Sequence, residues 1–210
     1  MKETQGQRGS PWKDGFLFVG NLLVLDFINT RPVIDGEPME LLSDLGAVLR
    51  WYVAAGLLSL RQANELRKNW GNSATGRAAV KVLQAWREQL RSALITWETG
   101  REVPKSAVKR LNRLMADYPV LTRLTLNGRK LASESWFRPQ TPEGLIAPVA
   151  RSAAMLFTTV DRNRVRVCGN CVLHFVDTSK KGTRRWCSME LCGNRLKVAA
   201  YTARRRNARS

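Results

Sequence analysis

The chain has 210 residues, of which 35 are Lys or Arg and 17 are Asp or Glu, so its formal net charge is +18. This excess of positive charge predicts a polyanionic partner, and the 44% hydrophobic fraction is ordinary for a globular protein. The longest apolar stretch, residues 16–28, is interrupted by Gly, Asn and Asp and is too short to cross a bilayer. The polar residues before it have no signal-peptide pattern, so we expect a cytoplasmic protein without disulfides and without a membrane partner.

The first 40 residues predict little regular structure. Residues 1–14 are polar, and we expect them to form a flexible arm. Residues 16–28 predict a short buried element, and their periodicity does not decide between strand and helix. Residues 29–40 contain two prolines and an Asp-Gly pair, which indicates a loop.

Helical spacing then dominates the sequence. Ser43 is expected to cap a helix that ends near Gly56, and Ser59 to cap a second helix that reaches about Trp70. Residues 71–76 are rich in Gly and Ser and predict a turn.

The strongest helical pattern runs from Arg77 to Glu98, and Pro104 opens another helix. Apolar and polar residues then alternate around an Asn-Gly pair in residues 120–135, which is typical of a β-hairpin. A helix is expected over about 142–158. We therefore predict an α+β fold with a mostly helical domain over residues 15–160 and a small carboxyl-terminal module over residues 161–210.

That module contains all four cysteines of the chain, with the spacing C-x2-C-x15-C-x4-C, at Cys168, Cys171, Cys187 and Cys192. Two close pairs at this separation are typical of a tetrahedral zinc site. Four unrelated buried cysteines, or a redox Cys-x-x-Cys pair, are the alternatives. The redox pair requires a βαβ context that the sequence does not show.

The cysteine pattern predicts one structural Zn²⁺, because four protein ligands leave no coordination position for water or substrate. A module of this size cannot bury enough core to fold without the metal. Gly169 and Asn170 are expected to take a positive φ in the first knuckle, and residues 172–186 to form a hairpin with Lys-Lys-Gly at its tip. With a helix starting near Cys192, this arrangement resembles a treble clef. His174 is the alternative fourth ligand, and we favour a place for it on the hairpin instead.

The same module is strongly basic, with 13 basic and 2 acidic side chains between Arg162 and Ser210. Lys197, Tyr201 and Arg204 share one face of the predicted final helix. Arg185 and Arg195 have an alternative role, which is to neutralise the negative charge of a Zn(Cys)4 centre. A solvated face without a partner is the alternative for the whole charge run. The nucleic-acid contacts that we expect are Lys180, Lys181, Arg184, Arg185, Arg195, Lys197, Tyr201, Arg204 and Arg205.

The stretch "RRWCSMELCGNR" at residues 184–195 resembles the CGNR zinc-finger module. The stretches "LDFINTR" (25–31) and "DGEPMELLSDLGAVLRWYVAAGLL" (35–58) resemble the ABATE domain that usually accompanies it. The resemblance implies a bacterial protein described as a putative stress-induced transcription regulator. It also implies that the four cysteines are the zinc ligands.

We therefore predict a DNA-binding transcription regulator that is not an enzyme, because no catalytic triad or phosphate-binding loop is present. Its helical domain would sense a small-molecule effector or form a homodimer. Asp26, Asn29 and Thr30 are candidates for an effector pocket, although they could instead end an element and satisfy backbone groups. The alternatives are an RNA- or ribosome-associated protein, in which Trp186 and Tyr201 stack on bases, and a ligand-binding protein or enzyme acting through the helical domain.

Overall fold

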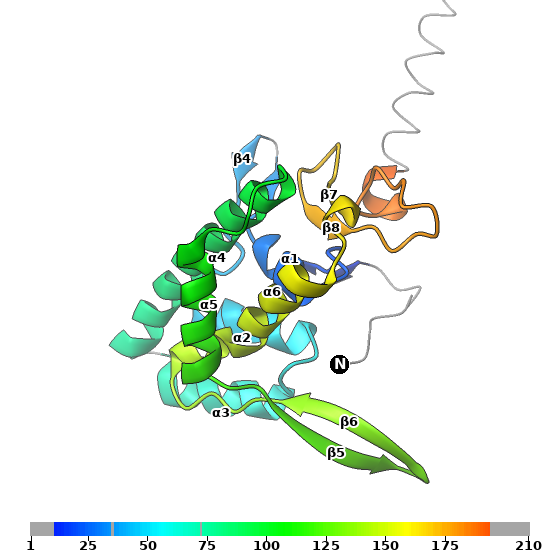
Figure 1. The fold of residues 1–210 in the computed structure, drawn as a ribbon. Helices are drawn as coiled ribbons and strands as arrows, with labels where there is room; N and C mark the ends of the chain where they lie inside the picture. Colours follow the sequence, from blue (N-terminus) through cyan, green and yellow to red (C-terminus); the bar gives the residue numbers. More distant parts are fainter. Residues whose placement is uncertain (1–10, 35, 72, 194–210) are drawn as a thin grey trace, which may run out of the picture.

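The computed structural model describes residues 11–34, 36–71 and 73–193, and it shows a mostly helical body with a small cysteine-bearing module at one side (Figure 1). The predicted α+β fold class is confirmed. No helix in the described part of the chain is long and apolar enough to cross a membrane. The helices are α1 (Leu23–Ile28), α2 (Leu45–Ala54), α3 (Leu60–Trp70), α4 (Ala74–Glu98), α5 (Lys105–Asp117) and α6 (Ala147–Thr159).

The described strands pair as short antiparallel hairpins. Residues 11–14, which we assigned to a flexible arm, contribute the first strand of one of them. The pairs are β1 (Trp12–Lys13) with β2 (Phe16–Leu17), β3 (Val33–Ile34) with β4 (Glu37–Pro38), β5 (Leu121–Asn127) with β6 (Lys130–Trp136), and β7 (Val165–Val167) with β8 (His174–Val176). The β5–β6 hairpin is the predicted Asn-Gly hairpin, and it projects from the body (Figure 1).

Helix α1 lies at the centre of the molecule, between α4 and α6 on one side and β8 on the other. Five of its six residues are buried, as expected for a helix that is apolar except for Asp26. The apolar stretch 16–28 thus divides into a strand and a helix. Gly20 lies between them, and a Cβ atom there would stand 2.7 Å from Cβ of Leu25 and 2.9 Å from the Asp26 nitrogen, so no larger residue fits.

Side-chain caps set where the next helices begin. Asp44, not Ser43, caps α2 by accepting a hydrogen bond from the Ala47 nitrogen. Ser59 caps α3 as predicted, in a capping box with Gln62. Ser73 caps α4, so that helix begins three residues before the predicted Arg77. The predicted 71–76 turn is correspondingly shorter.

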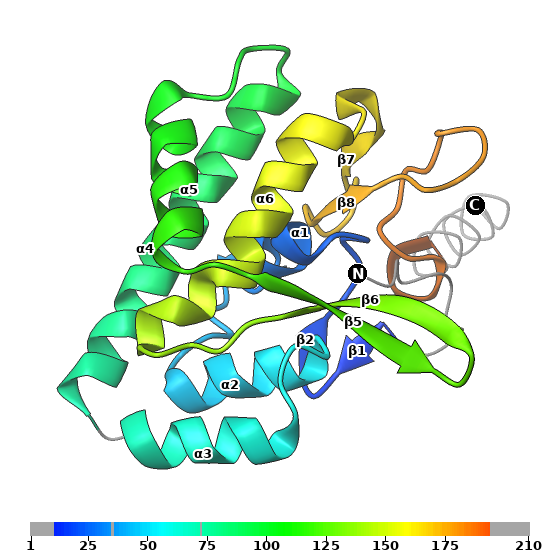
Figure 2. The same cartoon turned by 60° about the horizontal axis from the view of Figure 1, so that its bottom comes forward.

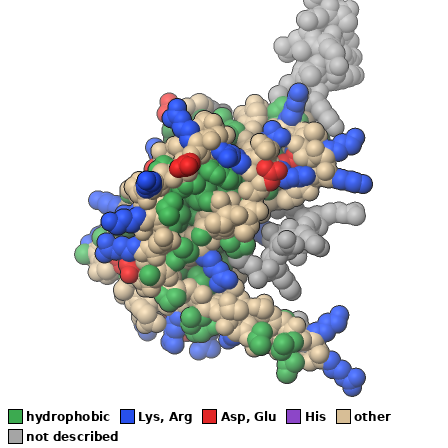
Figure 3. All heavy atoms as spheres, in the orientation of Figure 1, with side chains coloured by type: hydrophobic (Ala, Val, Ile, Leu, Met, Phe, Trp, Pro, Cys, Tyr) green, Lys and Arg blue, Asp and Glu red, His purple; other side chains and the backbone are tan. Residues whose placement is uncertain are grey.

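Helices α4, α5 and α6 lie side by side over α1 (Figure 2), and a short 3-10 turn, Pro142–Ile146, leads into α6. Trp86 and Leu90 of α4 and Leu111 of α5 are buried in the core, as their spacing predicts. The apolar spacing of α5 also predicts that Val108 is buried, but this residue is 44% exposed. Figure 3 shows Lys and Arg spread over the visible face, with few acidic side chains among them.

Two arginines of α4 secure the carboxyl end of α1. The guanidinium of Arg87 is 1% exposed and donates to Thr30, Glu88 and both carboxylate oxygens of Glu40. Burial alone would raise the pKa of Glu40, but hydrogen bonds from Arg87 and its charge hold that pKa below its usual value. Arg91 donates to the Ile28 carbonyl, so a cation faces the negative end of α1.

Replacing Arg87 should therefore be costly. Arg87→Met would leave Glu40 and Thr30 without their partner, and we expect a loss of about 3 kcal/mol in the free energy of unfolding, measured with urea. The matched control is Arg61→Met, whose ion pair with Glu65 is exposed, and which should cost about 0.5 kcal/mol or less. Equal losses in both variants would show that the Arg87 pairs contribute nothing specific.

Candidate metal centre

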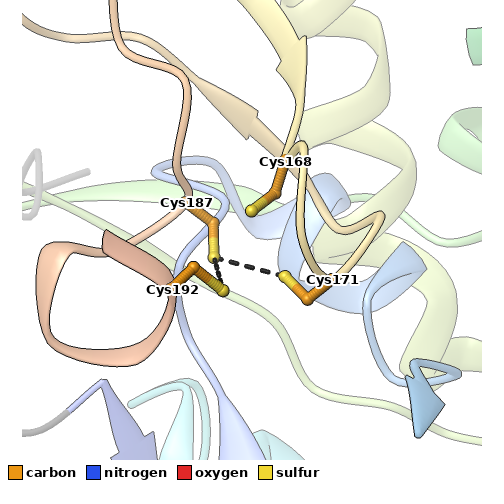
Figure 4. Close-up of side chains that lie close together, drawn as sticks. All are labelled: Cys168, Cys171, Cys187 and Cys192. Atoms are coloured by element: carbon orange, nitrogen blue, oxygen red, sulfur yellow. Dashed lines mark hydrogen bonds between the residues drawn. The ribbon is translucent and has the colours of Figure 1, made fainter. Parts of the chain in front are cut away.

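The four cysteine sulfurs lie close together around one point (Figure 4). All lie within 4.8 Å of one another, with Sγ–Sγ distances of 3.5 Å for Cys171–Cys187 and 3.8 Å for Cys187–Cys192. Four sulfurs held at about 2.3 Å from one tetrahedral ion would stand about 3.8 Å apart. The donor set and the spacing therefore fit a single Zn²⁺, and thiolate sulfur is a ligand that zinc favours.

The first cysteine pair lies in the turn of the β7–β8 hairpin. Cys168 follows β7 directly, its nitrogen donates to the Leu173 carbonyl at 2.8 Å, and Cys171 closes the turn. We expected the hairpin downstream, in residues 172–186. Instead, β8 pairs with β7 upstream of the cysteines, and residues 177–186 form a loop that returns to Cys187.

The turn has a different backbone from the one we expected. Val172, not Gly169 or Asn170, has the positive φ, at 52°, which is unfavourable for a β-branched residue. Gly169 is needed for a different reason, because a Cβ atom there would lie 3.2 Å from the Trp186 ring. A Cβ at Gly193 would lie 3.5 Å from another atom of the same indole. The ring thus fills the space between the two halves of the knuckle.

The second cysteine pair flanks one helical turn. Cys187 precedes the π-helical turn Met189–Gly193, and Cys192 lies within it. Cys168, Cys187 and Cys192 are buried, and they share a small apolar cluster with Leu173 and Phe175.

The electrostatics of the cluster favour a cation. The hydrogen bond with Cys187 lowers the pKa of the Cys171 thiol to about 5. The same hydrogen bond raises the pKa of Cys187, and burial raises that of Cys192 to about 11. One thiolate thus suppresses ionisation of its neighbours, and a divalent cation at the centre would remove this repulsion.

One polar side chain approaches the sulfurs directly. The Nδ2 group of Asn170 donates to Sγ of Cys192 at 3.5 Å. Sequence reasoning singled out Asn170 for its backbone only and missed this contact. Hydrogen bonds of this kind support the charge of a metal-bound thiolate.

Asp177 is a second residue that sequence reasoning missed. It is buried, and its carboxylate accepts hydrogen bonds from the nitrogens of Ser179 and Arg184. These contacts close the loop that carries Lys180 and Lys181. The Asp-Thr-Ser sequence is a typical signal for such an Asx-type turn.

The structure places the predicted nucleic-acid residues in different environments. Lys180, Lys181 and Arg185 are exposed on the loop. Arg184 is engaged within the module, because its guanidinium donates to the Cys187 carbonyl at 2.6 Å and lies over the Phe175 ring. The remaining predicted residues lie outside the described residues, namely Arg195, Lys197, Tyr201, Arg204 and Arg205.

His174 lies away from the sulfurs, on β8 as we expected. It is 4% exposed, and its Nδ1 atom is 3.0 Å from a carboxylate oxygen of Glu98 at the end of α4. The group of candidate metal ligands contains the four cysteines and not this histidine.

Asp26, Asn29 and Thr30 are buried and engaged with other parts of the protein. Asp26 accepts a hydrogen bond from the Gly20 nitrogen at 2.7 Å, and Asn29 pairs with the backbone of His174. Thr30 donates to the Phe27 carbonyl and accepts from Arg87. A hollow of about 570 Å³ lies elsewhere, between α4 and α5.

Two family models match the chain, one after the other along the sequence. Residues 21–160 match the ABATE family model, which is described as putative stress-induced transcription regulator. Residues 164–205 match the model of the CGNR zinc finger, and this range includes all four cysteines. No curated protein matches the chain.

The contact between Asn170 and Cys192 can be tested through zinc affinity. Asn170→Ala would remove a donor to the thiolate, so we expect zinc to bind about 10-fold more weakly in competition with a chromogenic chelator. Asn163→Ala is the control, because that residue is exposed and lies in the 3-10 turn before β7, outside the cysteine turn. Unchanged affinity in Asn170→Ala would show that the contact does not support the metal.

Asp26 predicts a dependence of stability on pH. Burial raises its pKa from 3.8 to about 7, although the Gly20 and Val19 nitrogens donate to it. The folded protein therefore holds this proton more tightly than the unfolded chain does, so the free energy of unfolding should decline as pH rises from about 4 to 7.

Asp26→Asn should remove that decline, because the amide still accepts from Gly20 and cannot ionise. Urea unfolding at several pH values would measure the effect, with exposed Asp117→Asn as the control. If the free energy of unfolding of Asp26→Asn declined equally steeply with pH, a titrating group other than Asp26 would be responsible.

Proposed function

Because the chain belongs to the ABATE family, described as putative stress-induced transcription regulator, we propose that it regulates transcription by binding DNA through its CGNR zinc finger. In this proposal the protein acts in the cytoplasm, and one Zn²⁺ is held by Cys168, Cys171, Cys187 and Cys192. The metal cross-links a module whose own hydrophobic core is too small to stabilise it, and it takes no part in catalysis. The observation that carries the proposal is the attachment of exposed basic residues to this thiolate cluster.

The loop between the cysteine pairs presents three free cations. Lys180, Lys181 and Arg185 are exposed, and their side chains form no hydrogen bond or ion pair with other residues in the described ranges. Arg184 and Asp177 hold the same loop in place. Cations on an ordered loop lose less entropy on contact with phosphates than cations on a flexible tail.

The remaining residues of the proposed surface are four basic residues and one tyrosine, namely Arg195, Lys197, Arg204, Arg205 and Tyr201. They follow Cys192 directly in the sequence, so the metal site would position the start of this segment. Phosphate contacts by such residues provide affinity, and contacts to base edges would provide specificity.

Double-stranded DNA is favoured over single-stranded RNA by the environment of Trp186. Single-strand binding uses aromatic rings whose faces are open to bases. The Trp186 ring is only partly exposed, because it lies close to Gly169 and Gly193 and packs against the cysteine cluster. Competition between duplex DNA and single-stranded RNA at equal salt concentration would separate the two functions.

The helical body is proposed to sense an effector or to mediate homodimerisation. The families matched are a regulator family and a zinc finger, and neither is an enzyme family. Asp26, Asn29 and Thr30 already have protein partners, which favours their alternative, structural role. An effector would find more room in the hollow between α4 and α5.

The salt dependence of DNA binding tests the loop cations. Changing Lys180, Lys181 and Arg185 together to alanine should lower the slope of log K against log salt by about 2 to 3, because each phosphate contact contributes about 0.9. The affinity should fall for all sequences.

The control removes three exposed cations from α3, with Arg61, Arg67 and Lys68 changed to alanine. This control has the same net charge as the loop variant and should keep most of the slope. Equal changes in the two variants would mean that net charge alone, and not the finger, directs binding.

A further inference from the structure

The edge of the zinc-finger hairpin is paired by the helical body. In β8, His174 and Val176 are two residues apart, so their backbone groups point to the same edge. At that edge the Nδ2 group of Asn29 donates to the His174 carbonyl at 2.8 Å, and the His174 nitrogen donates to Oδ1 of Asn29 at 3.0 Å. The Asn29 amide thus takes the place of a peptide group in a neighbouring strand.

Val176 is bound in the same way. Its nitrogen donates to the Gly20 carbonyl at 2.9 Å, and its carbonyl accepts from Nδ2 of Asn21 at 2.8 Å. All four backbone groups that β8 directs to this edge are therefore paired by residues 20–29. A strand edge that would otherwise be open is covered by the helical body.

Apolar and charged contacts strengthen the same junction. Leu17 and Val19, from the amino-terminal segment, are buried in the cluster that contains the cysteines. Val165 and Val176 of the finger pack in turn against the core of the body. The His174 ring contacts Glu98 of α4, and Asn29 is only 1% exposed.

We propose that Asn29 is a positioning residue that clamps the zinc finger to α1 and makes zinc binding and the stability of the helical body mutually dependent. Zinc orders the β7–β8 turn, the ordered β8 edge engages Asn29, and Asn29 is the residue that follows α1. Because α1 lies at the centre of the body, the metal then stabilises helices that it does not touch. This inference rests on the proposed zinc site and does not require DNA binding.

The coupling is reciprocal, since a change at either site must alter the other by the same free energy. It also gives a role to the polar residues of "LDFINTR". The contacts between β8 and residues 20–29 would thus hold the finger in one orientation on the body. A partner that displaces α1 would therefore displace the finger as well.

The test measures the full chain with and without zinc. In the unaltered protein, removing zinc with a chelator should lower the melting temperature, followed by circular dichroism at 222 nm, by about 5 °C or more. Hydrogen exchange of α4 peptides should accelerate at the same time. Unchanged melting and unchanged exchange in α4 would overturn the proposal.

Asn29→Asp keeps the size and the acceptor but cannot donate to the His174 carbonyl. We expect the zinc-dependent shift to fall to less than half, and zinc to bind about 10-fold more weakly. Thr30→Val is the matched control, because Thr30 is adjacent, buried and bonded to Arg87 rather than to the finger. It should lower the melting temperature with and without zinc and leave the shift intact.

A full zinc-dependent shift in Asn29→Asp would also overturn the clamp. If Asn29→Asp does not fold, Asn21→Ala, which removes one exposed hydrogen bond to Val176, should reduce the shift in part, and no reduction would count against the clamp. Loss of DNA binding with the shift retained would contradict the proposed function and not the clamp. A chain that binds no zinc would overturn the zinc site on which both depend.

Discussion

Four thiols within 4.8 Å of one another are the constraint on which the carboxyl-terminal part of this structure depends. Thiols packed this closely hinder one another's ionisation, since the hydrogen bond that lowers the pKa of Cys171 raises the pKa of Cys187. A tetrahedral divalent cation resolves the conflict, because it stabilises every thiolate at once. The turn, the loop with its free lysines and the packing of Trp186 are all arranged around that centre.

The second constraint is the burial of α1. This six-residue helix is apolar except for Asp26, and it cannot be exposed to water on any side without loss of core. The polar groups at its carboxyl end form hydrogen bonds with two different parts of the protein. Thr30 and the Ile28 carbonyl turn to the arginines of α4, and Asn29 turns to the backbone of β8. The stretch "LDFINTR" (25–31) thus lies where the helical body and the zinc finger meet.

Much of the fold follows from local patterns in the sequence. The capping box at Ser59, the apolar spacing of α4 and the Asn-Gly hairpin can each be recognised from residues that lie close together in the sequence. The cysteine spacing likewise indicates the candidate metal ligands. Features that depend on distant residues were missed. The pairing of Asn29 with His174 joins residues 145 apart, and the packing of Leu17 beside the cysteines is equally remote. Hydrophobic periodicity could not divide residues 16–28, because α1 is buried on all sides and has no polar face.

The zinc K-edge X-ray absorption spectrum of the purified protein in solution tests directly whether the four cysteines bind one zinc ion. We expect one zinc per chain with four sulfur neighbours at about 2.3 Å and no nitrogen or oxygen bound to the metal. A zinc ion bound by nitrogen or oxygen, or by fewer than four sulfurs, would contradict this expectation. The finger, its basic loop and its attachment to α1 would then need a different physical basis.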